Sequence, residues 1–136
     1  MKTFLLAFII SLIILLGLDV LWLGATLDIL YKPNMPGMVR PDPIIPAAIG
    51  FYLLYAFGLS YLVITPNLKS GHLTLTLKAA AYGLAAFATY DLTGLATINN
   101  WSLKLSLIDM AWGTFAAIIA TNATALILRA LGRGRS

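Results

Sequence analysis

The sequence contains no cysteine, no glutamate and a single histidine, His72, which lies in a polar stretch. The absence of cysteine excludes disulfide bonds, thiolate metal sites and thiol nucleophiles. Zinc and di-iron sites need several His, Cys or Glu side chains on facing elements, so we predict no metal and no cofactor. Charged residues make up only 10% of the chain and hydrophobic residues 60%, whereas about a quarter of an ordinary soluble domain is charged. This composition predicts one membrane domain over residues 1–136.

The net charge of +4 comes from Lys and Arg at the ends of apolar segments. These residues do not form a patch interleaved with aromatic side chains, so nucleic acid is not an expected partner. The expected partners are membrane lipids, and a homo-oligomer is a further hypothesis.

Four apolar segments are each long enough, at about 1.5 Å per residue, to cross a bilayer. The first begins like a signal peptide, but its apolar pattern continues past the usual core and no cleavage site follows, so it is retained as a helix. We predict an all-α integral membrane protein, a bundle of four transmembrane helices. The predicted spans are residues 4–24, 44–64, 75–98 and 102–128.

The segment 25–43 is rich in proline and is predicted to be a loop. Its length favours a lid over the outer mouth of the bundle, and a simple connector is the alternative.

The distribution of basic residues predicts the orientation. With four spans, both termini and the connection near His72 share one side of the membrane. That side carries six basic residues and the other three, so we expect both termini in the cytoplasm and a multi-pass membrane protein. The first set is Lys2, Lys69, Lys78, Arg129, Arg133 and Arg135, and the second is Lys32, Arg40 and Lys104.

Acidic residues inside the spans are the candidate catalytic groups. A mid-helix Asp costs roughly 2.5–3.5 kcal/mol on insertion, which the Ala-rich segment around Asp91 offsets poorly, so we expect that segment to be an inner helix. Asp19, Asp91 and Asp109 are all predicted at ~8–11 Å beneath the outer boundary. The short turn 99–101 makes the last two spans neighbours, which predicts that Asp91 and Asp109 form a coupled pair.

Burial and like charge both favour the protonated form of such acids. The cluster therefore shares protons, binds a cation or pairs with Lys104. Polar and aromatic side chains on the same levels are the candidate substrate-binding residues: Trp22, Tyr52, Tyr55, Tyr90, Thr93, Ser106 and Trp112. Tyr31 and Trp101 are interpreted as anchors at the membrane interface.

Three ordered motifs carry a resemblance that covers essentially the whole chain: Leu18-Asp19-Val20-Leu21-Trp22-Leu23-Gly24, Tyr90-Asp91-Leu92-Thr93 with Trp101, and Asp109-Met110-Ala111-Trp112-Gly113. With these motifs the chain resembles the bacterial membrane family called domain of unknown function 2177. The resemblance implies a small four-span inner-membrane protein without an established activity. Gly94 departs from the pattern, because Asn is expected there.

The sequence leaves three functions open. The first is an enzyme that acts on a lipid or isoprenoid-like substrate, with one Asp as general acid and another as general base. The second is a proton-coupled or cation-binding small transporter that acts as a homo-oligomer. The third is an accessory subunit of a larger membrane complex.

Overall fold

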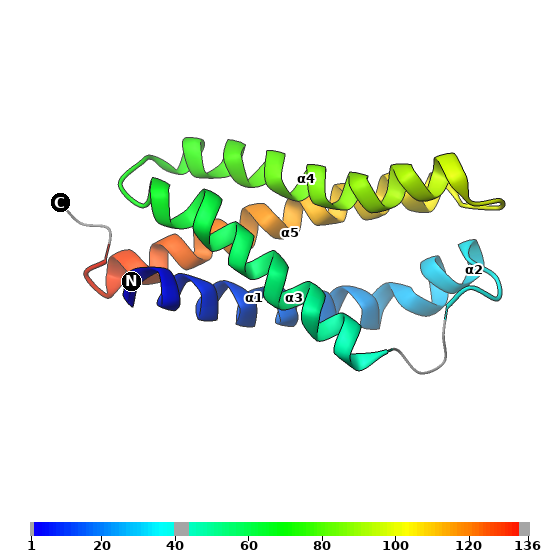
Figure 1. Ribbon diagram of the computed structural model, residues 1–136, viewed down its shortest axis with the longest axis horizontal. Helices are drawn as coiled ribbons and strands as arrows, with labels where there is room; N and C mark the ends of the chain where they lie inside the picture. The colour runs from blue at the N-terminus through cyan, green and yellow to red at the C-terminus, as the bar shows by residue number, and fades with distance from the viewer. Residues whose placement is uncertain (1, 40–43, 134–136) are drawn as a thin grey trace.

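The computed structural model describes residues 2–39 and 44–133. Long helical rods lie side by side, and the start of α1 and the last turn of α5 lie at the same end (Figure 1). The elements are α1 (Lys2–Thr26), η1 (Leu27–Tyr31), α2 (Lys32–Asn34), α3 (Ile45–Leu59), η2 (Ser60–Ile64), η3 (Thr65–Asn67), α4 (His72–Thr97) and α5 (Leu103–Ala130). We call the half of the bundle near Lys2 the terminal half and the other the distal half.

Three rods in the described part of the chain are long and apolar enough to cross a membrane: Lys2–Asn34, Ile45–Asn67 and Leu103–Ala130. The fourth, α4, is richer in Ala and Thr and falls outside that group. It nevertheless packs along α5 (Figure 1). The predicted all-α membrane bundle of four helices is confirmed.

The first helix is longer than predicted. Residues 25–34, which were expected to begin a loop, continue α1 through a π-helical turn (η1) into α2. The π-helical turn is closed by the Lys32 N–H, which donates to the Leu27 carbonyl. Pro33 follows this turn at the start of α2, where its missing N–H costs little. The predicted loop is therefore wrong over residues 25–34, and its residues 40–43 lie outside the described part of the chain.

Small residues bring α4 and α5 into close contact. A Cβ added at Gly83 would lie 2.7 Å from the Gly113 carbonyl oxygen, and one at Gly113 would overlap the Phe87 ring. Such glycines allow two membrane helices to approach closely. The helix with the most buried residues is α5, whereas α4 buries one face and exposes Leu77, Leu84 and others on the opposite face. The expectation that the Asp91 segment is the inner helix was therefore wrong, and α5 has that place.

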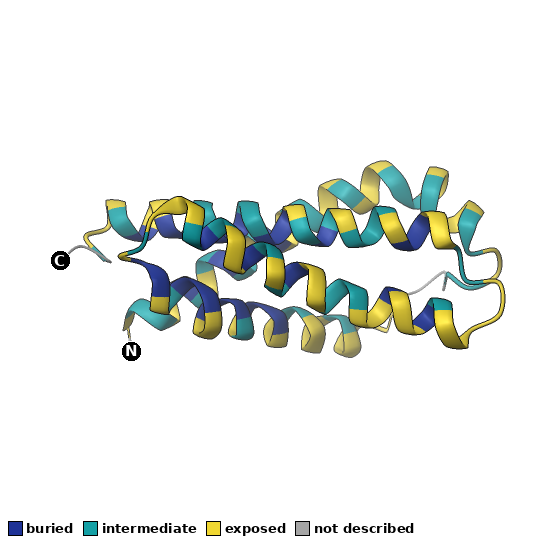
Figure 2. Cartoon of the chain, turned by 90° about the horizontal axis from the view of Figure 1, so that it is seen from above, coloured by how far each residue is buried: buried dark blue, intermediate teal, exposed yellow. Residues whose placement is uncertain are grey.

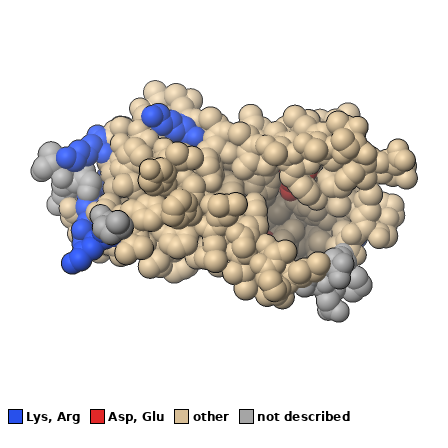
Figure 3. Space-filling model, in the orientation of Figure 1, with Lys and Arg blue, Asp and Glu red and all other residues tan. Residues whose placement is uncertain are grey.

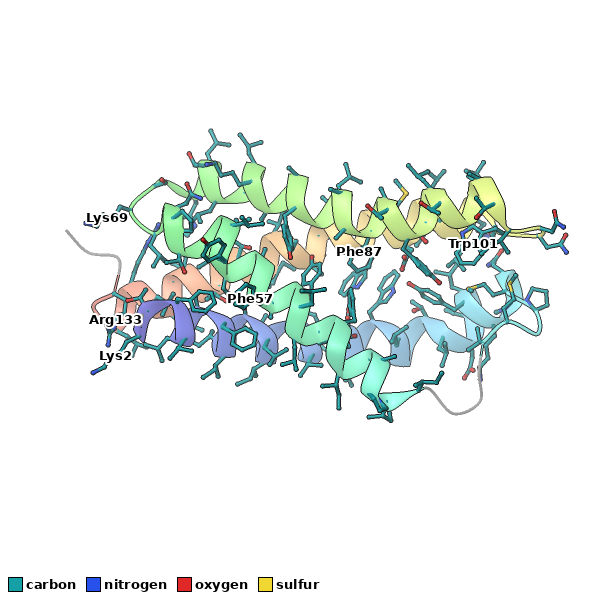
Figure 4. All side chains as sticks on the ribbon, viewed as in Figure 1. Lys2, Phe57, Lys69, Phe87, Trp101 and Arg133 are labelled. Atoms are coloured by element: carbon teal, nitrogen blue, oxygen red, sulfur yellow. The ribbon has the colours of Figure 1, made fainter. Side chains whose placement is uncertain are left out.

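The buried core lies mostly in the terminal half (Figure 2). There, Ala7 and Leu15 of α1 pack with Leu59 of α3 and with the alanines of α5. Going toward the distal half, α3 crosses α1 and moves away from α4, so the two separate (Figure 1). Lys2, Lys69 and Arg133 lie at the terminal end and Trp101 at the distal end (Figure 4). These basic residues therefore lie at the end of the bundle where α1 begins and α5 ends, as the predicted cytoplasmic location of the termini requires. The orientation of the bundle in the membrane stays a prediction.

Candidate functional site

The separation of α3 from α4 leaves a cavity of about 350 Å³ in the distal half. Its walls come from α1, η1, α3, α4 and α5: Asp19, Trp22, Leu23, Tyr31, Phe51, Tyr52, Ala86, Phe87, Tyr90, Asp109 and Trp112. The space-filling view shows this side of the molecule hollowed, with part of an acidic residue visible inside (Figure 3). The hollow lies on the long side of the bundle, between the two ends of the helices (Figure 3). We call it the lateral cavity.

Asp19 is fixed by donors from two other helices. Its Oδ2 accepts a hydrogen bond from the Tyr52 hydroxyl at 2.5 Å, and its Oδ1 accepts one from the Trp112 indole at 3.1 Å. Hydrogen bonds to a charged acceptor are stronger than neutral ones, and two of them hold the carboxyl in one orientation. Both partners were predicted as site residues, and the structure brings all three together on the cavity wall.

Asp109 is reached through a second chain of hydrogen bonds. The Trp22 indole donates to the Tyr31 hydroxyl at 2.8 Å, and that hydroxyl donates to Asp109 Oδ1 at 2.6 Å. The Trp22 and Trp112 rings stack with centroids 4.5 Å apart and an interplanar angle of 5°. The two indoles therefore join the Asp19 and Asp109 groups into one polar and aromatic unit.

Asp91 lies behind this unit and does not line the lateral cavity. It is only 3% exposed, and its Oδ2 has no hydrogen-bond partner. It faces a smaller cavity of about 70 Å³, which we call the small cavity, with these lining residues: Tyr31, Met35, Tyr90, Asp91, Trp101, Ser102, Leu105 and Asp109. Asp109, Tyr31 and Tyr90 line both cavities. The predicted juxtaposition of Asp91 and Asp109 is found, and a direct role of Asp91 at the lateral cavity is not supported.

The remaining predicted binding residues divide by position. Tyr90 borders both cavities, and its ring packs edge-on against Trp101. The Tyr55 ring is buried beneath the lateral cavity, where it shares a narrow void with Asp19. Thr93 is exposed and lines neither cavity. Ser106 is buried and donates to the Ser102 carbonyl at 2.7 Å, so its hydroxyl supports the first turn of α5. Neither Thr93 nor Ser106 lines the lateral cavity or the small cavity, and their role in substrate binding stays a prediction.

Tyr31 and Trp101 are site residues that the sequence interpretation missed. Both were taken for interfacial anchors, yet Tyr31 holds Asp109, and Trp101 packs over Gly94. A Cβ at Gly94 would overlap the Trp101 ring, so the glycine makes room for the indole. No helical spacing signalled this contact, because Trp22 and Tyr31 are nine residues apart and a regular α-helix would place them on opposite faces. The π-helical turn η1 follows Trp22 and ends at Tyr31, in a stretch where proline predicted a loop. Tyr31 and Met35, from the segment predicted to be a lid, line the small cavity, and a lid over the outer mouth of the bundle stays a prediction.

The described residues also limit which charges can balance the acids. Lys104 is exposed and pairs with none of them, so of the three alternatives for balancing the acids the Lys104 pairing is not found. The ion pair found in the described ranges joins Lys32 and Asp28 at 3.0 Å on the exposed side of η1 and α2. Those same ranges hold no cluster of three or more His or Asp side chains suited to a metal ion. Aromatic rings, hydroxyls and carboxyls are therefore the chemistry that the cavities offer.

Comparison with known protein families gives a match over most of the chain. The family described as "Predicted membrane protein (DUF2177)" matches residues 4–126. No curated protein and no solved structure matches the chain.

Proposed function

Because the chain belongs to the family of predicted membrane proteins DUF2177, whose description names no activity, we propose a function from the geometry of the lateral cavity. We propose that this cavity takes up the polar end of a lipid or isoprenoid-like molecule from the bilayer. Asp109 then transfers a proton to that molecule, and Asp19 stabilises the positive charge that develops on it.

The observation that carries this proposal is the position of two carboxyl groups inside a cavity that opens sideways. Ligand sites are typically 300–1,000 Å³, mostly apolar, with a few polar groups that converge. The lateral cavity has about 350 Å³, and its apolar walls include Phe51, Phe87 and Leu23. An apolar chain can enter between α3 and α4 without leaving the hydrocarbon, and its polar end then meets Asp19 and Asp109.

The two carboxyls are suited to different tasks. Asp19 is held by two donors, Tyr52 and Trp112, which fix its orientation. Asp109 accepts from Tyr31 through Oδ1 and lies between the two cavities. A general acid must exchange its proton in each cycle, and a base or charge stabiliser must keep its position. We therefore assign proton transfer to Asp109 and stabilisation of positive charge to Asp19.

The packing of the terminal half argues against transport in this conformation. A transported solute needs a route through the whole bundle, with access from either side of a central site. Below the lateral cavity, Leu15, Tyr55 and Leu59 are at most 5% exposed and fill the space between the helices. A cavity that opens on the side of the bundle and is closed toward the terminal half is the arrangement expected of a site that exchanges ligand with the bilayer.

Native mass spectrometry of the protein released from mild detergent tests the binding step. We expect the wild-type chain to retain one lipid-like molecule. Ala86→Trp places an indole in the lateral cavity and should abolish retention. Leu84→Trp is the matched control, because Leu84 lies on the exposed face of the same helix and lines neither cavity. Equal retention by both variants, or no retention by the wild type, would refute the proposed site.

The chemical step is tested with the molecule so identified. Incubation with the wild-type protein should change its mass or its double-bond pattern, and Asp109→Asn should bind it without converting it. Release of the molecule unchanged by the wild type, together with uptake into protein-containing vesicles, would establish transport in place of catalysis.

A further inference from the structure

Asp91 is the most deeply buried acid in the described chain, and the proposed chemistry leaves it without a task. It is 97% shielded from solvent, one of its carboxyl oxygens is unpartnered, and it does not touch the lateral cavity. An ionised carboxylate in such a place is strongly disfavoured unless it is paired. The carboxyl must therefore be neutralised by something that the small cavity holds.

The groups that face Asp91 limit the choice. The small cavity presents Asp109 from α5, the hydroxyls of Tyr31 and Ser102, and Tyr90 from α4 itself. The described lining contains no Lys, Arg or His, and Lys32 on the neighbouring α2 is engaged with Asp28. The third intramembrane acid, Asp19, lies across the lateral cavity and is engaged by Tyr52 and Trp112. Within the described residues, the charged neighbour of Asp91 in the small cavity is therefore a second acid, Asp109, and no basic side chain lines that cavity.

We propose that Asp91 and Asp109 share one proton, and that Asp91 acts through Asp109 as the positioning residue that keeps this proton at the lateral cavity. Two carboxyls at one small cavity are more stable with one proton between them than with two negative charges. Asp109 belongs to both cavities, so the shared proton reaches the lateral cavity without movement of the backbone.

The proton balance of this arrangement is simple. The pair carries one negative charge when it holds the proton. When Asp109 gives the proton to a basic atom of the ligand, an O–H bond breaks, the new bond to hydrogen forms on the ligand, and the pair is left with two negative charges. The repulsion between them then favours recovery of a proton, from the ligand or from water that enters the small cavity. This second step rests on the function proposed above, whereas the shared proton itself does not.

Infrared spectroscopy of the full chain in lipid nanodiscs tests the shared proton without any added ligand. Protonated and ionised carboxyl groups absorb at different frequencies, and the frequency of the protonated form falls when it is hydrogen-bonded. At neutral pH the wild type should show one protonated carboxyl with the low frequency of a strong hydrogen bond. Asp91→Asn should lose the band, because the Asn amide can donate to an ionised Asp109.

Asp109→Asn should keep a protonated carboxyl but move it to higher frequency, because Asp91 remains buried while losing the partner that shares its proton. Asp28→Asn on the exposed surface is the control and should leave the band unchanged. A wild-type spectrum without a protonated carboxyl would overturn the proposal, as would a band that Asp109→Asn does not shift. Circular dichroism of each variant establishes that the helices are intact, so a folding defect is not mistaken for loss of the proton. Because ligand binding is measured separately, failure of the lateral cavity to retain a lipid would leave this result unaffected.

Discussion

Substituting Gly83 by alanine should separate α4 from α5 and destabilise the bundle. The added Cβ would lie 2.7 Å from both the Ala117 Cβ and the Gly113 carbonyl oxygen. Neither is the end of a flexible side chain, so one helix must move. Overpacking of this kind costs about 1–3 kcal/mol. Replacing a helix glycine by alanine also returns about 1 kcal/mol of helix propensity, so the net loss is smaller than the clash itself.

A matched substitution isolates the clash. Gly50 is a helix glycine in α3, and a Cβ there meets nothing within 4 Å, so Gly50→Ala should gain the propensity term alone. The difference in unfolding free energy between the two variants should therefore be about 1–3 kcal/mol. Thermal or denaturant unfolding in detergent, followed by circular dichroism, measures it. A Gly83→Ala protein as stable as Gly50→Ala would refute the close helix contact that positions Asp91 beside Asp109.

Further substitutions test single contacts. Tyr52→Phe removes one of the two donors to Asp19 and should cost about 1.5–3 kcal/mol of stability in denaturant unfolding, and a cost near zero would contradict the Tyr52–Asp19 contact. Arg129→Ala frees the carbonyls of Leu68 and Ser70 at the terminal end, so proteolysis between η3 and α4 should become faster, and unchanged cleavage would count against it. Lys32→Ala should change stability by no more than about 1 kcal/mol, because its ion pair is exposed, and a larger loss would show that this pair holds η1 in place. A reporter enzyme fused to the C-terminus should be active only when it is one that functions in the cytoplasm; activity of an exported reporter would reverse the predicted orientation.

The relative positions of the acidic residues along the bundle axis could be predicted, because each residue of an α-helix advances the chain by about 1.5 Å. Asp19 and Asp109 are far apart in sequence but lie on one cavity wall, as equal distances from the outer ends of their spans require. The tight turn before α5 likewise determined that Asp91 and Asp109 lie on neighbouring helices. Its geometry is closed by Asn100, whose φ of +64° is a conformation that asparagine tolerates.

The parts that could not be predicted depend on packing and on local helix irregularity. Pro33 is a strong loop signal, but a π-helical turn directly before it lets the helix continue, and that turn carries Tyr31 to Asp109. The position of Thr93, by contrast, follows from periodicity: two residues along an α-helix rotate a side chain by about 200°, so a buried Asp91 places Thr93 on the opposite, exposed face.

A crystal structure grown from a lipid phase would show directly what occupies the lateral cavity. We expect elongated density that enters between α3 and α4, passes Phe51 and Phe87, and ends with a polar group within hydrogen-bond distance of Asp109 or Asp19. A structure in which α3 packs against α4 and closes the lateral cavity, or in which ordered water alone occupies it, would refute binding of a lipid-like molecule at this site.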